Sequence, residues 1–179
     1  MQRSQWFHAD RAGDILGLDY RDGLHKPVKE FGDFPLVLYY GGWTLKDLYE
    51  NRKTKPFLNP PYGYSFYETP EETGYYALRT APLQTHLTWD KQIAIPPKDG
   101  WKLCPAPIAV VGTLLVLMDS PDSFLGGKFG SCAEDMGNGG HRPALTIERS
   151  VLYVRTTMEV YSDGKTFPML QRIECKKIG

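Results

Sequence analysis

The cysteines and histidines are the side chains of this chain that could supply a nucleophile, a general base or a metal ligand. They are Cys104, Cys132, Cys175, His8, His25, His86 and His141. Cys132 and His141 lie nine residues apart, and a cysteine nucleophile needs its base nearby in the fold rather than in the sequence. The chain lacks the CxxC and HExxH spacings of zinc sites. We therefore expect ordinary buried or loop residues, with no catalytic residue, no metal site and no cofactor.

Phosphate binding is the second chemistry that the residue types suggest, because glycines punctuate residues 126–140. A Walker loop needs Gly-Lys-Ser/Thr at the start of a helix, where backbone N–H groups cradle the phosphates. Here Gly127 and Lys128 precede Phe129, and the residues beyond have the character of strands. The pattern favours turns between twisted strands over a phosphate site.

Charge and composition narrow the class of protein. Lys+Arg and Asp+Glu both total 21, so the formal net charge is zero, which argues against non-specific nucleic-acid binding. An odd number of widely spaced cysteines argues against a disulfide scaffold. The 14 prolines and 18 glycines suit short strands and many turns better than a helical bundle.

Membrane insertion is not expected. Residues 1–10 are polar and do not have the composition of a signal peptide. The longest apolar run, residues 106–118, contains Gly112 and is shorter than the roughly 20 residues that a spanning helix needs. We expect a soluble protein without a membrane span, either cytoplasmic or associated with a virion.

Local patterns predict the elements of the first half. Residues 35–40 form a strand, and Thr44 caps a short helix over residues 45–51, with Asp47 at its third position. The proline- and tyrosine-rich residues 53–70 indicate a loop or connector, which is our candidate boundary between an N-terminal region and the main body.

In the second half we predict a strand over residues 75–79, ending before Pro82, and one or two helical turns over 88–93. The apolar run is ambiguous, because its valines favour a strand and its length and early prolines favour a buried helix. A turn at residues 162–165 leads to a last strand over 170–178, with Ile173 and Cys175 inward.

The clearest strand is residues 151–161, where apolar and polar positions alternate. One face carries Leu152, Val154, Thr156, Met158 and Val160. The other face carries Val151, Tyr153, Arg155, Thr157, Glu159 and Tyr161. Tyr and Arg supply rigid, amphipathic contact area in binding surfaces, although an ordinary solvent-facing sheet surface is equally consistent with this pattern.

The order of these elements resembles the C-type lectin fold. Residues 74–79 (GYYALR), 88–92 (TWDKQ) and 107–111 (PIAVV) resemble the constant part of the variable proteins diversified by retroelements. Residues 139–145 (GGHRPAL) and 151–155 (VLYVR) resemble the variable half of those proteins. The resemblance spans residues 73–179.

The resemblance implies an α+β fold of the C-type lectin-like type, with mixed or antiparallel sheets, two helices, and paired first and last strands. It makes the apolar run a helix, residues 73–179 the module, and residues 1–72 an N-terminal region packed on it. The calcium motifs Glu-Pro-Asn and Trp-Asn-Asp of sugar-binding lectins are missing, so no calcium-dependent carbohydrate site is expected. The Trp-Asp pair that often follows the VLYVR-like segment in the variable proteins is also absent, with Thr156 to Glu159 in its place.

Diversification in that family mutates adenines in Asn-type codons, which excludes Glu, Lys, Met, Gln and Trp from diversified positions. By this criterion the poor candidates are Glu134, Met136, Glu148, Met158 and Glu159. The compatible positions, which we take as the ligand-binding surface, are His141, Ala144, Thr146, Arg149, Tyr153, Arg155 and Thr157.

The resemblance implies a non-enzymatic protein that binds a macromolecular ligand, most simply another protein, through a hypervariable surface. One alternative is an enzyme of the formylglycine-generating type, which shares the fold and needs two reactive cysteines held close together, such as Cys132 and Cys175. Another is a viral or cell-surface structural protein, which would assemble through large, flat apolar contacts.

Overall fold

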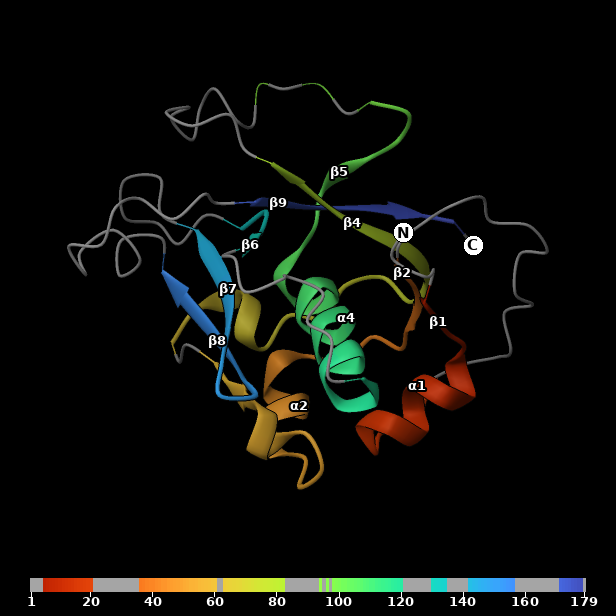
Figure 1. The fold of residues 1–179 in the computed structure, drawn as a ribbon, viewed down its shortest axis with the longest axis vertical. Coiled ribbons are helices and arrows are strands. Elements are labelled where there is room, and N and C mark those ends of the chain that lie inside the picture. The colour runs from red at the N-terminus through yellow and green to blue at the C-terminus, as the bar shows by residue number, and fades with distance from the viewer. Residues whose placement is uncertain are drawn as a thin grey trace.

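The computed structural model describes residues 5–20, 36–60, 63–82, 94, 96, 98–120, 130–134, 142–156 and 171–178. Figure 1 shows helices and strands mixed along the chain. In chain order they are β1 (Gln5–Phe7), α1 (Ala9–Leu16), β2 (Leu36–Tyr40), α2 (Leu45–Glu50), the 3-10 turn η1 (Lys55–Phe57), β3 (Leu58–Asn59), the 3-10 turn η2 (Ser65–Tyr67), β4 (Gly74–Pro82), β5 (Lys102–Leu103), α4 (Ala106–Asp119), β6 (Gly130–Ser131), β7 (Pro143–Glu148), β8 (Val151–Thr156) and β9 (Gln171–Lys177).

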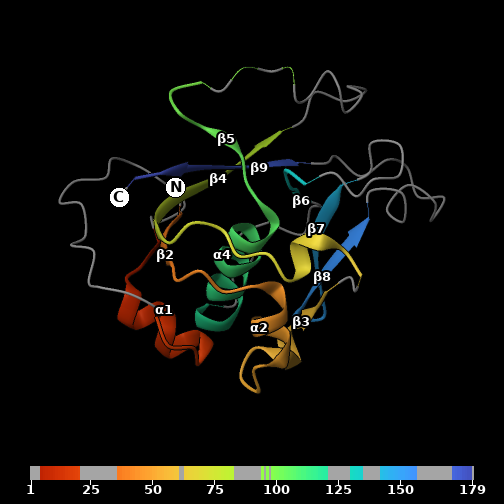
Figure 2. The same ribbon diagram turned by 180° about the vertical axis from the view of Figure 1, so that it is seen from behind.

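The strands form one mixed sheet in the order β1-β2-β4-β9-β6-β7-β8-β3, with β5 paired to β9. Most pairs are antiparallel, and the parallel ones are β1 with β2, β6 with β9, and β3 with β8. The three helices of the described residues lie on one side of this sheet, with α4 in the centre (Figures 1 and 2). The predicted α+β class is confirmed.

The pairing of β4 with β9 brings the two ends of residues 73–179 together. The antiparallel register runs from Tyr76 opposite Lys177 to Pro82 opposite Gln171. This confirms the predicted pairing of the first and last strands, and Ile173 and Cys175 face the core as predicted. Strand β4 extends through Pro82 rather than ending before it.

Helix α4 resolves the ambiguous apolar run. It spans 14 residues with Pro107 in its first turn, where a missing N–H leaves no hydrogen bond broken. The helix is apolar on all sides and its first eleven residues are buried, which is why no strand-like or helical periodicity showed in the sequence. Among the described residues, no helix is long and apolar enough to cross a membrane.

The N-terminal region shares this sheet and this core. Strand β2 pairs with β4 in antiparallel register, with Leu36 opposite Leu78. Gly112 of α4 lies against both strands, since a Cβ there would stand 2.7 Å from Leu78 Cδ2 and 3.0 Å from Leu38 Cδ2. Residues on either side of the expected boundary therefore pack around one helix.

Several local predictions are confirmed. Strand β2 begins at Leu36, and helix α2 begins with a capping box in which Thr44 and Asp47 bond to each other's backbone N–H. The predicted connector at residues 53–70 holds η1, β3 and η2 rather than loop alone. The expected turns at 88–93 and 162–165, and strand residues 157–161, lie outside the described residues.

Candidate functional site

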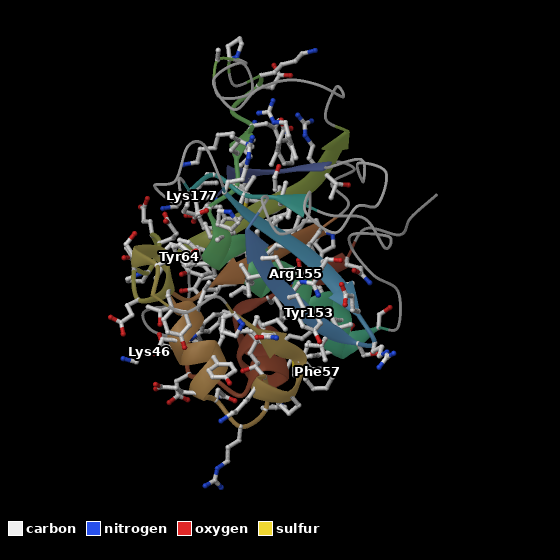
Figure 3. The ribbon with its side chains drawn as sticks, turned by 90° about the vertical axis from the view of Figure 1, so that its left-hand side faces the viewer. Lys46, Phe57, Tyr64, Tyr153, Arg155 and Lys177 are labelled. Atoms are coloured by element: carbon white, nitrogen blue, oxygen red, sulfur yellow. The ribbon has the colours of Figure 1, made fainter. Side chains whose placement is uncertain are left out.

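Strand β8 presents different chemistry on its two faces. Leu152 and Val154 are buried in the main core, while Tyr153 and Arg155 are half-buried on the opposite face. Figure 3 looks at this side of the molecule, with both side chains standing on the strand that faces the viewer. The predicted alternation is confirmed for the described part of the strand.

Arg155 crosses the outer face of the β7–β8 hairpin. It pairs in register with Ala144, its guanidinium lies 4.8 Å from the centroid of the Tyr153 ring, and its Nη2 is 3.0 Å from Oε1 of Glu148. The side chain thus runs from the level of Ala144 past Thr146 to the hairpin end. Because the Arg155 and Glu148 side chains are 27% and 46% exposed, the ion pair contributes about 1 kcal/mol or less.

The hairpin turn is built from residues with strained backbone. Arg149 and Ser150 have φ values of 50° and 64° and connect Glu148 to Val151 as a two-residue turn. Such turns require positive φ at both positions and normally use Asn or Gly, because a Cβ in this region costs roughly 1 kcal/mol. Both side chains are exposed, so the tip projects Arg149 into solvent.

A short segment of the N-terminal region lies along the free edge of β8. Strand β3 pairs with it in parallel, placing Leu58 opposite Leu152 and Asn59 opposite Tyr153. Lys55 and Asn59 are exposed and Phe57 is half-buried. This neighbour was not predicted from the sequence, because a strand of two residues is too short to show a periodicity.

The seven predicted surface residues have different outcomes. Tyr153, Arg155 and Arg149 lie on the surface, while His141 and Thr157 fall outside the described residues. Ala144 and Thr146 share the face of Arg155 and Tyr153 but are only 0% and 4% exposed, so their expected surface position is wrong. Strand β7 has a neighbour on each side, and the larger Tyr153 and Arg155 stand beside these two short side chains. Alternation predicts the face that a residue joins, not how deeply its neighbours cover it.

The same face continues across β9 and β4 as a row of charges that sequence reasoning did not single out. Arg79 Nη2 is 2.7 Å from Oε2 of Glu174, and Arg172 Nη2 is 3.4 Å from its Oε1. The Arg79 guanidinium also lies 4.2 Å from the Trp101 ring centroid. Glu174 and Arg172 are nearly buried, so this row holds the outer layer together rather than forming an open site.

The three cysteines converge beneath the sheet. All three are free and fully buried, and Cys175 lies close enough to Cys104 to affect the pKa of that thiol. Burial raises the pKa of the Cys104 and Cys132 thiols well above the ordinary value. The neutral thiol is a poor nucleophile, so these are the surroundings of structural cysteines rather than of activated ones.

Glu134 lies beside these thiols at the start of α4. The Ala106 N–H donates to its Oε1, which supplies the helix with the cap that Pro105 lacks. Its Oε2 is buried and has no hydrogen-bond partner in the described part of the chain. Burial raises the pKa of Glu134 to about 7, against the opposing effect of the Ala106 hydrogen bond.

A hollow of about 320 Å³ lies elsewhere, between the end of α1 and helix α2. Its walls are Leu18, Asp19, Trp43, Asp47, Glu50 and Asn51. Asp47 is already engaged in the capping box of α2. Across the described residues, no group of three or more His, Cys, Asp or Glu side chains is arranged to hold a metal ion.

Comparisons of this chain with models of protein families, with curated proteins and with solved structures yield no significant match.

Proposed function

We propose that this chain is a non-enzymatic ligand-binding protein that displays a diversifiable surface on a C-type lectin-like scaffold. The observation that carries the proposal is the different burial of alternate side chains along β8. Leu152 and Val154 are buried in the core, while Tyr153 and Arg155 are half-buried on the outer face and lie outside the clusters of core residues. Residues of the second kind can change without unfolding the protein.

The topology of the sheet supports the proposed C-type lectin-like scaffold. The first and last strands of residues 73–179 pair with each other, as expected for a C-type lectin-like fold, and the apolar helix α4 packs beneath them. Of the two helices expected for that fold, α4 is the one that the described part of residues 73–179 contains. The buried thiols, with their raised pKa values, favour binding over the formylglycine-generating chemistry, which needs reactive cysteines.

The test is selection of ligands from a random peptide library displayed on phage. The library is panned against the immobilised wild-type chain and counter-selected against the Tyr153→Ala/Arg155→Ala double variant. We expect enriched peptides that bind the wild type and lose at least about tenfold in affinity for the double variant. Peptides that bind both proteins equally, or no enrichment, would overturn the proposal.

The matched control is Arg11→Ala/Tyr20→Ala, which removes the same two residue types from the exposed surface at α1, remote from β8 in Figure 1. It should bind the enriched peptides as the wild type does. Melting temperatures of both double variants separate loss of binding from loss of folding. Diversification is tested at the gene, where a near-identical template repeat and a reverse transcriptase would be found beside it.

A further inference from the structure

The surface around Tyr153 includes residues from outside the predicted module. We define the β8 surface as Lys55, Phe57, Asn59, Arg149, Tyr153 and Arg155. The first three come from η1 and β3, which lie along the edge of β8 in parallel register. Any ligand that covers the Tyr153 ring therefore also meets Asn59, its register partner.

This surface has a local excess of positive charge in a chain that is neutral overall. Residues 55–59 and 148–155 contain three cations, Lys55, Arg149 and Arg155, and one carboxylate, Glu148. That carboxylate is already bound to Arg155. Lys55 and Arg149 are exposed, and no ion pair is found for either within the described residues.

The arrangement also shows which anion suits it. Arg155 holds a carboxylate at one edge of its guanidinium while the plane lies over the Tyr153 ring. Phe57, half-buried against the core, and the Tyr153 ring add apolar area on this side of the molecule (Figure 3). Nucleic-acid binding proteins neutralise many phosphates at once, whereas three cations around two aromatic rings suit a few carboxylates on a polypeptide.

We propose that the β8 surface binds an acidic segment of a partner protein, and that Lys55 and Arg149 receive its carboxylates. This inference rests on the proposed function and specifies its ligand. Electrostatic complementarity of this kind makes binding sensitive to charge reversal at the surface and to ionic strength.

The test uses fluorescence anisotropy at low salt with three labelled probes of equal length: an oligoglutamate peptide, an oligolysine peptide and oligothymidine. We expect the oligoglutamate probe alone to bind, and Lys55→Glu and Arg149→Glu each to weaken it about fivefold or more. The matched controls are Lys46→Glu and Lys177→Glu, whose lysines pair with Glu68 and Glu72 away from the β8 surface (Figure 3). These controls should change binding by less than about twofold.

Three results would overturn the inference: no binding of oligoglutamate, equal binding of oligothymidine, or equal losses in the Lys46→Glu and Lys177→Glu controls. The library selection separates this failure from failure of the proposed function. Enriched peptides that need Tyr153 and Arg155 but are neutral and indifferent to Lys55→Glu would leave the binding function intact and remove the acidic partner. Melting temperatures confirm that each variant folds.

Discussion

The two faces of the β7–β8 hairpin are built from the same strands but are held in different ways. On the inner face, Leu145, Leu152 and Val154 are buried in a core that includes α4. On the outer face, Tyr153 and Arg155 are held by one ring contact and one ion pair. Burial of apolar surface is worth several times more than a partly exposed ion pair. The inner face therefore determines the fold, and we expect substitutions of Tyr153 and Arg155 to cost little stability.

The largest effect should come from the inner face. Leu152→Ala removes a fully buried side chain and should lower the free energy of unfolding by about 4 kcal/mol, through lost burial and the cavity left behind. The neighbouring Tyr153→Ala should lower it by about 1 kcal/mol or less. Urea denaturation of both variants measures the difference. Equal losses of unfolding free energy in the two variants would show that the inner and outer faces contribute equally to stability.

The next effect concerns the one buried carboxyl at the start of α4. The folded state keeps Glu134 protonated up to about pH 7, whereas the unfolded chain releases this proton near 4.5. Stability should therefore fall as the pH rises between these values, by roughly 3 kcal/mol in total, and should level off above them. Glu134→Gln stays neutral at every pH, so it should remove most of this slope and stabilise the protein near pH 8.

A second substitution separates the charge of Glu134 from its hydrogen bond to the Ala106 N–H. Glu134→Ala should also lose the pH slope, but near pH 5 it should be less stable than the glutamine variant by about 1 kcal/mol, because the helix loses its cap. Urea denaturation across the pH range measures both. If the stability of Glu134→Gln still fell with rising pH, Glu134 would not be the group responsible for the pH dependence.

The smallest effect lies at the two-residue turn that joins β7 to β8. Ser150→Gly should raise the free energy of unfolding by about 1 kcal/mol, because glycine adopts its positive φ without strain. Ser120→Gly is the control, since Ser120 has a φ of −144° and glycine offers no relief there. Thermal melts compare the two. Stabilisation by both substitutions, or by neither, would show that the positive φ of Ser150 does not lower the stability of the protein.

The sequence predicted much of the inner architecture, because local signals and burial agreed there. The capping residues of α2 and the alternation of β8 both specified their elements correctly. For the apolar run, only the family resemblance predicted a helix. The sequence pattern could not, because uniform burial removes the periodicity that distinguishes helix from strand.

The outer surface was predicted less well, for a geometric reason. The alternation of the sequence assigned Ala144 and Thr146 to the face of Arg155, but it did not predict that both would be buried there. The approach of β3 to β8 joins residues nearly a hundred positions apart, and no local pattern encodes such a contact. Glu148 was set aside as unsuited to diversification, yet it fixes the position of Arg155.

The place of β4 within the sheet bears on how the protein can be divided. This strand has β2 on one side and β9 on the other, so its backbone hydrogen-bonding groups are engaged on both. A fragment beginning at residue 73 would leave one of these rows of hydrogen-bonding groups open along a strand that carries Tyr75, Tyr76 and Leu78, which favours pairing with another chain. Strand β2 thus protects this edge of β4 from pairing with another chain, and a fragment cut at residue 73 would be prone to aggregate.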